Sequence, residues 1–566
     1  MRTLLLLFFC GCFISINAIA QNPLAIPDTL HGPVYNLVVQ EDSVQFLVGP
    51  KTPTYGYNGA ILGPTLFMNK GESVQINVMN LLQDPTTVHW HGLHVPAEDD
   101  GGPHQLIQSG QSWSPVFDVM NHAGTFWYHP HGDGYTEYQV TKGLAGVIIV
   151  KDSIEATYNL PSTYGVDDFP LVIQSKSFDI LNQLAAFTHD DSLVLINGTL
   201  NPYLSIPSQM VRFRLLDGSA DRSYYVGLSN NMNFQVIGSD GGLLSAPVST
   251  TRLLISPGER YEIIVDFGSM MGQTVNLMSY SSQLPNNIIG SNQVSAGPAT
   301  LPGYAANPLN GADFTLLQLT VVGQTVNPVV SIPASFQPIT SLPVGLADTT
   351  RQITFSPEMM SPQNMISGPF TLNGSSFDMD SVNIVIPIDN MEIWSLVNNT
   401  MVAHPFHIHD VEFQIIDRNG VAVAPIEAGW KDVVLVKPME TVRFITKFED
   451  FSNDSVPYMY HCHLLHHEDE GMMGAFIVTN GLTSGLSYVE KNASLLFPNP
   501  VIDQLTLVAP TATEPTVVDL TGRNRPVNVS KSENGWIIQT DQLESGVYIL
   551  RFYSDGEINL VKFVRL

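Results

Sequence analysis

Short runs of β-branched and aromatic residues, each bounded by Gly, Pro, Asn or Asp, recur along the whole chain. Examples are ESVQINVMN, MVRFRLLDG, RYEIIVDFG and TVRFITKFED. Such runs are typical of strands, and long stretches of helical periodicity are scarce. The sequence therefore predicts an all-β fold.

The length of the chain, 566 residues, is too great for one hydrophobic core, so several domains are expected. Turn-rich segments near 155–168 and 481–492, and the Pro/Gly/Asn-rich stretch 284–310, are the expected joints. The predicted domains are 22–153, 160–320, 345–482 and 490–566. Each of the first three is large enough for a Greek-key β-sandwich, and the fourth shows the pattern of a small β-sandwich.

The first 20 residues, MRTLLLLFFCGCFISINAIA, have the features of a signal peptide. Arg2 precedes an apolar run, and Ala18-Ile19-Ala20 forms a small-residue cleavage site. A membrane anchor is the alternative, but the apolar run is short for a span and no later segment is comparable. Lipidation at Cys12 is a further alternative. The mature protein is therefore expected to be exported.

Charge and cysteine content narrow the functional classes. A formal net charge of −28 repels phosphate backbones and so argues against a nucleic-acid partner. Since Cys10 and Cys12 fall in the signal, the mature chain would keep only Cys462. A single cysteine in an exported chain forms no internal disulfide, so its thiol is either buried and inert or a metal ligand.

Histidines occur in four His-x-His pairs, two in the first predicted domain and two in the third. They are His89 and His91, His129 and His131, His407 and His409, and His461 and His463. Residues two apart on a strand project from the same face, so each pair presents two imidazoles to one side. Any one pair is weak evidence, but four pairs predict a metal centre, and imidazole suits copper, zinc, iron and nickel.

Cys462 lies between the two members of the last pair, so strand alternation sends its sulfur to the opposite face. The sequence there predicts a second metal on that face, held by a His₂Cys set with a weak thioether, as in a blue-copper electron-transfer site. The spacing Cys-x4-His-x4-Met selects one histidine and the methionine of this set. The predicted ligands are His404, Cys462, His467 and Met472. His466 and Met473 are out of register and are expected to be a surface histidine and a core methionine. Structural zinc is a poorer interpretation, since it usually takes two or more cysteines.

The motifs HWHG, WYHPH, HPFHIH and HCHLLHHEDEGMM, in this order, resemble those of three-domain multicopper oxidases, including bacterial laccases, copper-efflux oxidases and bilirubin oxidases. The resemblance covers roughly residues 30–480 and implies three cupredoxin-like domains and four copper ions. It implies a type 1 copper on the His₂Cys-Met set above. It implies a type 2 copper on His89 and His407. It implies a type 3 pair, one copper on His91, His129 and His463, the other on His131, His409 and His461.

The same resemblance implies a reaction. A small reducing substrate gives electrons one at a time to the type 1 copper, and they pass through Cys462 and its neighbours to the three-copper cluster, where four reduce O₂ to two waters. Asp100 in PAEDDGGP and Glu468 in HHEDEG match positions of acids that assist proton delivery. Solvated loop carboxylates are the alternative for both residues.

The electron donor is the least defined feature. Copper-efflux oxidases have an Asp and a Met at the positions of Thr400 and Val402, and Met359, Met360, Met365 and Met379 are scattered and expected to pack in the core. Phenols, aromatic amines or tetrapyrroles are therefore favoured over cuprous ions. A two-domain copper nitrite reductase and a non-enzymatic scaffold are the other classes. The first lacks four His-x-His pairs, and the second would be expected to have lost ligands.

Residues 490–566 resemble the C-terminal sorting domain of the type IX secretion system of Gram-negative bacteria. The matching segments are Phe497-Pro498-Asn499-Pro500 and Gly546-Val547-Tyr548. This resemblance implies export across the outer membrane by that machinery, to a secreted or surface-attached form. A carbohydrate-binding or adhesive module is the alternative, although Trp536 is the only tryptophan in this segment. The oligomeric state stays open.

Overall fold

The computed structural model describes residues 21–295, 300–302, 304, 307–359, 364–480, 496–509, 512–519, 523–532, 534–554 and 557–566. The expected signal peptide, residues 1–20, lies outside these residues. The chain divides into two compact units, one ending at Asn480 and the other beginning at Gly481. No helix in the described residues is long and apolar enough to cross a membrane.

The first sandwich of unit one pairs a sheet ordered β4-β3-β6-β7, with β8 also on β6, with a sheet ordered β2-β5-β10-β9. In β6 every second residue is buried, among them Val74, Ile76 and Val78, as expected for a strand with one face on a core. The strands and helices are β2 (Thr29–His31), β3 (Val34–Val44), β4 (Thr52–Tyr57), β5 (Thr65–Asn69), β6 (Ser73–Asn80), η1 (Ala97–Asp99), β7 (Ser112–Trp113), β8 (Val116–Asp118), β9 (Gly124–Tyr128), α1 (Thr136–Lys142) and β10 (Gly146–Lys151).

The second sandwich combines the order β14-β13-β11-β16-β21-β18-β19, with β12 on β11, with the order β1-β15-β23-β22-β17-β20. Its elements are β1 (Asn22–Pro23), η2 (Glu155–Thr157), β11 (Asp168–Phe178), β12 (Leu184–Ala185), β13 (Leu193–Ile196), β14 (Thr199–Leu200), β15 (Pro202–Pro207), β16 (Met210–Asp217), β17 (Tyr224–Leu228), β18 (Phe234–Ser239), β19 (Gly242–Thr250), β20 (Leu253–Ile255), β21 (Arg260–Asp266), β22 (Thr274–Tyr280), η3 (Ser281–Gln283) and β23 (Asp313–Val322). The stretch 284–310, expected as a joint, instead connects β22 to β23, which pair with each other. The prediction of a domain joint there is wrong.

The third sandwich combines the orders β25-β24-β27-β31-β29 and β26-β33-β32-β28-β30. Its elements are η4 (Val344–Leu346), β24 (Thr349–Pro357), α2 (Asn364–Ser367), β25 (Phe370–Leu372), β26 (Ile384–Pro387), β27 (Met391–Asn398), β28 (His404–Ile408), β29 (Phe413–Arg418), η5 (Pro425–Glu427), β30 (Val433–Val436), β31 (Thr441–Lys447), β32 (Tyr458–Cys462), α3 (Leu465–Asp469) and β33 (Met473–Thr479). Strand β32 is wholly buried and lies between β28 and β33, so it is central to its sheet.

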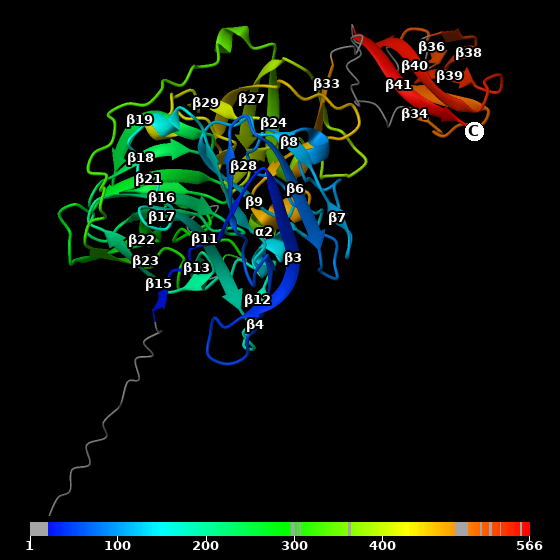
Figure 1. Ribbon diagram of the computed structural model, residues 1–566. Coiled ribbons are helices and arrows are strands. Elements are labelled where there is room, and N and C mark those ends of the chain that lie inside the picture. The colour runs from blue at the N-terminus through cyan, green and yellow to red at the C-terminus, as the bar shows by residue number, and fades with distance from the viewer. Residues whose placement is uncertain are drawn as a thin grey trace, which may run out of the picture. The chain divides into compact units, whose positions relative to one another are not determined.

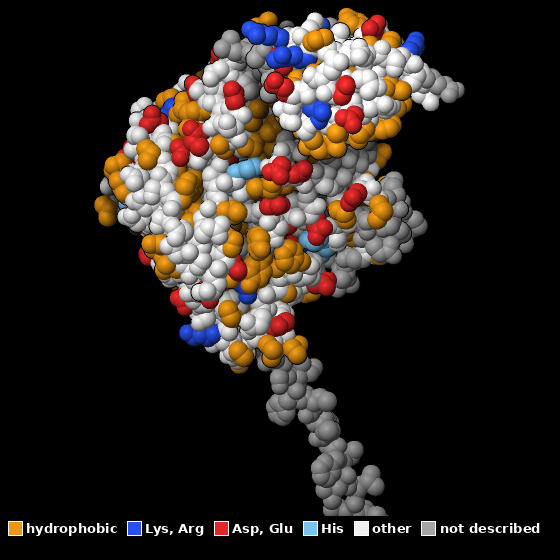
Figure 2. All heavy atoms as spheres, turned by 90° about the vertical axis from the view of Figure 1, so that its right-hand side faces the viewer, with side chains coloured by type: hydrophobic (Ala, Val, Ile, Leu, Met, Phe, Trp, Pro, Cys, Tyr) orange, Lys and Arg blue, Asp and Glu red, His pale blue; other side chains and the backbone are white. Residues whose placement is uncertain are grey.

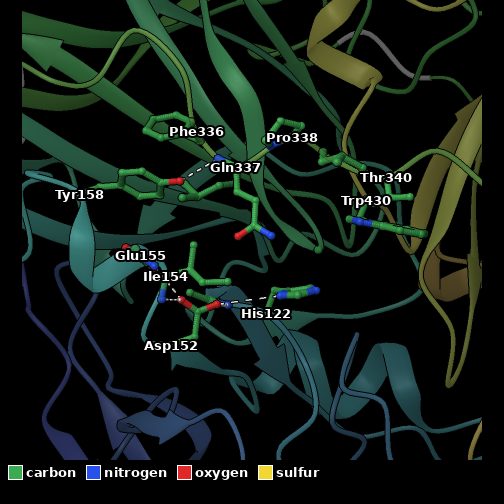
Figure 3. Close-up of a pocket in the computed structure, with 14 residues that line it drawn as sticks. His122, Asp152, Ile154, Glu155, Tyr158, Phe336, Gln337, Pro338, Thr340 and Trp430 are labelled. Carbon is green, nitrogen blue, oxygen red and sulfur yellow. Dashed lines mark hydrogen bonds and ion pairs between the residues drawn. The ribbon is translucent and has the colours of Figure 1, made fainter.

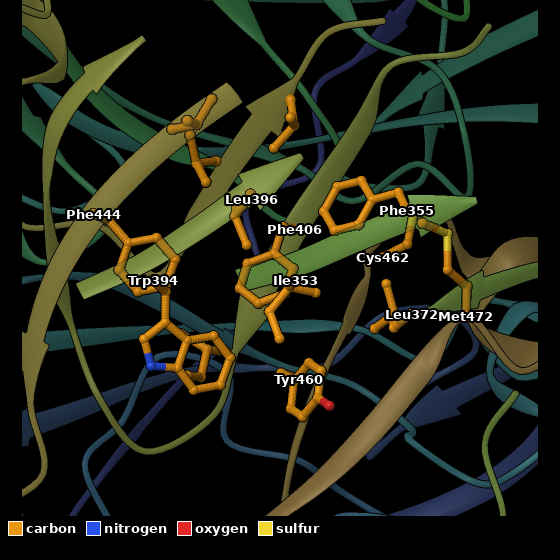
Figure 4. Packing of buried hydrophobic residues seen from close by; sticks show 14 of the residues in the cluster. Ile353, Phe355, Leu372, Trp394, Leu396, Phe406, Phe444, Tyr460, Cys462 and Met472 are labelled. Carbon is orange, nitrogen blue, oxygen red and sulfur yellow. The ribbon is translucent and has the colours of Figure 1, made fainter. Parts of the chain in front are cut away.

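The core of the third sandwich is aromatic. Figure 4 shows Trp394, Phe406 and Phe444 packed between the sheets, and the Trp394 and Phe444 rings stack with centroids 6.0 Å apart. Cys462 and Met472 belong to the same buried cluster. The sulfur atoms of the chain's last metal motif therefore lie in a dry, packed environment.

The second unit is a small sandwich with the orders β34-β35-β39-β38 and β37-β36-β40-β41 (Figure 1). Its strands are β34 (Leu496–Phe497), β35 (Gln504–Val508), β36 (Thr516–Asp519), β37 (Asn524–Arg525), β38 (Val529–Ser532), β39 (Gly535–Gln539), β40 (Gly546–Ser554) and β41 (Glu557–Arg565). It has its own core, which includes Leu505, Leu550 and Phe563. The all-β prediction, with three larger sandwiches and a small C-terminal one, is confirmed.

Candidate metal centres

One metal-ligating group is built within the third sandwich. His404 begins β28, Cys462 ends the neighbouring strand β32, and His467 lies in α3 directly after that strand. The Cys462 Sγ atom is 3.4 Å from His404 Nδ1 and 3.6 Å from His467 Nδ1, and the two nitrogens are 3.2 Å apart. The three side chains thus present one sulfur and two nitrogens to a common point.

The remaining nitrogens of these two imidazoles are held by other groups. His404 Nε2 lies 2.7 Å from Thr400 Oγ1, and His467 Nε2 donates to the Ile366 carbonyl oxygen at 2.6 Å. Burial lowers the pKa of His404 to about 3 and that of His467 well below its ordinary value. Both rings are therefore neutral, and their Nδ1 lone pairs are directed at the point they share with the sulfur, as metal binding requires.

Met472 is brought to this group by the backbone. The Cys462 amide donates to the Met472 carbonyl at 3.0 Å, and the Met472 amide donates to the His467 carbonyl at 2.8 Å. Met473 packs with Met459 and Ala475, as a core methionine does.

His466 was expected on the surface, and that expectation is wrong. Its side chain is 15% exposed, and Nδ1 lies 3.3 Å from Glu137 Oε2 of α1. The contact arises because α3 packs against α1, an arrangement that spacing in the sequence does not reveal.

The other eight predicted histidines converge between the first and third sandwiches, and all are buried. Two lie within strands, His407 in β28 and His461 in β32. Three directly follow a strand, namely His129, His409 and His463, and the other three lie in connections. His131 Nε2 is 3.1 Å from His409 Nε2 and 3.1 Å from His461 Nε2. One group of three nitrogens thus draws its members from both sandwiches.

His91 and His129 come together in a second group, with the His463 ring next to both and the ligand nitrogen of His89 within 4.8 Å of theirs. His91 Nδ1 and His129 Nε2 lie 3.3 Å apart. The His463 ring centroid is 5.0 Å from that of His91 and 5.4 Å from that of His129. Neither His463 nitrogen has a hydrogen-bond partner among the described residues, although both are buried.

His89 and His407 form the third group, with ring centroids 5.8 Å apart. Each donates through Nδ1 to a backbone carbonyl, His89 to Asp100 at 2.9 Å and His407 to Asp432 at 2.8 Å. Each Nε2 is buried and has no hydrogen-bond partner in the described structure. A buried acceptor without a partner costs free energy, and a cation bound to the two Nε2 atoms would remove this cost.

The hydrogen bonds of the group made by His131, His409 and His461 also leave nitrogens free to bind a metal. His409 donates through Nδ1 to Asp100 Oδ2 at 2.7 Å, and His461 Nδ1 lies 3.0 Å from Glu468 Oε2. Their Nε2 atoms therefore carry no hydrogen, and the lone pairs of both face His131 Nε2. Burial lowers the pKa of His131 to about 3, so protons do not fill this space. Facing lone pairs fit a transition metal.

Asp100 and Glu468 are 1% exposed, so the alternative of solvated loop carboxylates is wrong for both. Glu468 Oε1 also lies 3.4 Å from His131 Nδ1. Burial by itself would raise the pKa of Glu468, but the neighbouring His131 and His461 lower it far below its ordinary value. Asp100 and Glu468 thus each place a buried carboxylate against the outer nitrogens of cluster histidines.

Sequence reasoning missed Asp432 and Arg260. His91 Nε2 lies 3.1 Å from Asp432 Oδ1, and Arg260 of β21 binds both oxygens of Asp432, at 2.6 and 2.5 Å. The second sandwich, which supplies no ligand, is thereby joined to the cluster. A usable signal was present, since Lys431 and Asp432 are charged residues directly before the apolar run of β30.

Comparison with known proteins agrees with this geometry. Multicopper oxidase family models match residues 38–155, 181–287 and 348–482, and a model of the secretion system C-terminal sorting domain matches 495–565. The multicopper oxidase mco of Staphylococcus haemolyticus is 32% identical over 455 residues, covering 79% of this chain and 88% of that protein. The cell division protein FtsP of Dickeya dadantii is 30% identical over 474 residues, covering 81% and 92%.

Among solved structures, the laccase-like multicopper oxidase CueO of Ochrobactrum sp. matches with a TM-score of 0.71 and 32% identity, over 81% of this chain and all of that one. The chain therefore belongs to the multicopper oxidase family, and its three larger sandwiches are cupredoxin-like. Its C-terminal unit is a secretion system sorting domain by family match.

Proposed function

We propose that this protein oxidises small phenolic or other aromatic donors and couples this to the reduction of O₂ to water. The observation that supports the proposal most strongly is that all twelve predicted ligand residues are buried and gathered in two separate groups. His404, Cys462 and His467, with Met472, fit a type 1 copper. The eight clustered histidines fit a type 2 copper on His89 and His407 and a type 3 pair on the other six.

Bound copper would supply the one-electron steps and the activation of oxygen, while the protein fixes the ligands and the path between them. Cys462 is covalently joined to His461 and His463, which belong to the two type 3 groups. An electron that enters at the sulfur therefore has a short through-bond path to the cluster. The dry core around Cys462 excludes water and other reactants from that path.

Reduction of O₂ to water consumes protons, and the buried carboxylates are placed to pass them. Asp100 contacts His409, and Glu468 contacts His461 and His131. Each carboxylate also fixes the tautomer of the histidine it accepts from, which directs the other nitrogen at the metal. We assign proton transfer and ligand orientation to both residues.

The donor class is inferred from residues at the type 1 centre. Thr400 hydrogen-bonds His404, and Val402 is wholly buried, so neither position offers a cuprous-ion ligand. The Ochrobactrum relative is described as acting on lignin model compounds, which are aromatic. Met359, however, is 66% exposed, so the expectation that it packs in the core is wrong for this residue, while Met360 and the side chain of Met365 lie outside the described residues. Cuprous-ion oxidation is the second candidate because of this exposed thioether.

A non-enzymatic role is the third candidate, because one relative is a cell division protein. The retained ligand set favours an oxidase. Copper stoichiometry, the visible spectrum and oxygen uptake with 2,6-dimethoxyphenol and with Cu(I) test these alternatives together. Uptake driven by the phenol supports the proposal, and uptake driven by Cu(I) alone favours the second candidate. Full copper loading with no uptake favours the third.

We further propose that the C-terminal unit directs export through the type IX machinery to the medium or the cell surface. The sorting-domain match and the separate core of this unit support an independently folded signal. Fractionation of cells producing the full chain or a chain ending at residue 485 tests it. Equal export of both forms would contradict the sorting role.

A further inference from the structure

A cavity of about 190 Å³ lies where the three larger sandwiches and their connections meet. His122 and Asp152 come from the first sandwich and its exit, Leu243 from the second, and Trp430 from the third. The segment 336–340, which we call the strap, closes one side. In Figure 3, strap residues lie opposite Asp152 and His122, with Trp430 beside them. None of these side chains has a part in the metal centres.

The walls of this junction cavity are aromatic and preformed. Tyr158 and Phe336 meet edge to face with ring centroids 5.1 Å apart. The Phe336 amide donates to the Ser245 carbonyl at 2.9 Å, and the Gln337 amide donates to the Tyr158 hydroxyl at 2.7 Å. The Ile339 amide also donates to Ser245 Oγ at 3.0 Å, and Gln414 Nε2 donates to the Thr340 carbonyl at 2.9 Å. The strap is thus fixed at four points, so a ligand would not have to order it.

The cavity offers hydrogen-bond donors. The Tyr158 oxygen accepts from the strap, which leaves its own hydrogen without an acceptor among the described residues. His122 Nδ1 lies 3.2 Å from the Lys70 ammonium, which can only donate, and 3.9 Å from Asp152 Oδ2. The shorter contact places the lone pair on Nδ1 and the ring hydrogen on Nε2. Burial and Lys70 lower the pKa of His122, in keeping with a neutral ring.

An acid in the cavity wall, Asp152, already accepts hydrogen bonds from backbone amides, and further acids line a neighbouring groove. Asp152 accepts from the amides of Ala123, Ile154 and Glu155. An adjoining groove of about 560 Å³ shares His122, Thr340 and Trp430 with the cavity. That groove is lined by four acids, Asp410, Glu412, Glu449 and Asp450, and by two cationic side chains, His94 and Lys447, that pair with three of them, so its net charge is negative. A negatively charged ligand would be repelled from this side.

We propose that the junction cavity binds an uncharged single-ring phenol, with the ring against Tyr158, Phe336 and Trp430 and an oxygen accepting from Tyr158. The size agrees, since an apolar cavity of about 150 Å³ takes one benzene ring. Trp430 is two residues from Asp432, which contacts His91 and His407. One lining residue is thus close in sequence to a contact of the histidine cluster, and no lining residue belongs to the type 1 centre.

Calorimetric titration of the copper-loaded protein with 4-hydroxyacetophenone tests the proposal, because this electron-poor phenol resists oxidation. Saturable binding is expected, with 4-hydroxybenzoate at least about tenfold weaker because of its charge. Tyr158→Phe should weaken binding about fivefold, the value of one hydrogen bond. The measurement involves no turnover, so its result is independent of the proposed oxidase activity.

Ile339→Trp, which fills the cavity from the strap, should abolish binding. Val344→Trp is the matched control, because Val344 is an exposed residue further along the same connection and does not line the cavity. Thermal unfolding of each variant shows whether it is folded. No saturable heat, equal binding by Ile339→Trp and wild type, or equal binding of the two ligands would each overturn the proposal.

Discussion

The two candidate metal centres are assembled in different ways. The His₂Cys group uses two neighbouring strands and one short helix of the third sandwich, all between residues 404 and 472. The eight-histidine cluster needs ligands from the first and third sandwiches, and contacts such as His131 to His461 span 330 residues of chain. The first centre is thus a product of local topology, while the second depends on the docking of two sandwiches. Variants can separate the two.

Cys462→Ser gives the largest expected effect. It removes the only thiolate ligand of the described chain, so the type 1 copper and the intense blue absorption should be lost, and donor oxidation should stop. The cluster histidines are unchanged, so three copper ions per chain should remain by elemental analysis. Loss of all copper would show that the two centres do not assemble separately.

Asp100→Asn should act on the cluster alone. It removes the carboxylate that accepts from His409 Nδ1, and removal of such a partner typically lowers activity or metal affinity about 10- to 100-fold. Oxygen turnover should fall while the blue absorption is unchanged. Glu98→Gln, an exposed neighbour in η1, is the control. A matched loss of blue absorption in Asp100→Asn would contradict the separation.

His94→Gln tests the docking of the first and third sandwiches. His94 contacts Asp410 at 2.7 Å and Asp450 at 3.1 Å. Burial opposes its charge, but these carboxylates raise the pKa of His94 to about 9. A raised histidine pKa stabilises the fold fully below about pH 6.5, and this stabilisation is lost as the pH rises through about 9.

The free energy of unfolding of His94→Gln should therefore be lower than that of wild type at pH 6, by about 1–2 kcal/mol, because the buried Asp410, whose pKa burial raises, takes up a proton in the variant and limits the loss. The difference should disappear near pH 10. Denaturant unfolding at both pH values measures it. A difference that grows with pH would contradict the assignment.

Removal of the C-terminal unit after Asn480 should have the smallest effect on the metal-binding unit. The two units have separate hydrophobic cores, so the melting temperature of the first should change by less than about 2 °C. Differential scanning calorimetry of both forms gives this comparison. A large decrease would mean that the units share stabilising contacts.

Sequence alone could predict the fold class and which side chains the structure gathers into the two candidate metal centres, for a chemical reason. Copper centres need particular residue types, and strands impose a spacing of two, so the pattern HCH can be read without knowledge of tertiary structure. The structure brings Cys462 and His461 to different groups, in keeping with that alternation.

Contacts between sandwiches could not be predicted in the same way. Asp432 and Arg260 are 172 residues apart, and their ion pair depends on how the second sandwich packs on the third. His466 meets Glu137 only because α3 lies against α1. The stretch 284–310 looked like a joint because its composition is that of any loop, whether it lies between domains or within one.

The long sequence separation within the cluster has a consequence for biogenesis. His89 and His91 are made early in synthesis, but the nitrogens that complete their surroundings come from residues 407–463, near the end of the metal-binding unit. The cluster cannot form before the third sandwich has folded on the first, since these long-range contacts are the last to be available. Full copper occupancy would then report that the metal-binding unit is finished and correctly folded, and a chain cut in the third sandwich could not retain the metal.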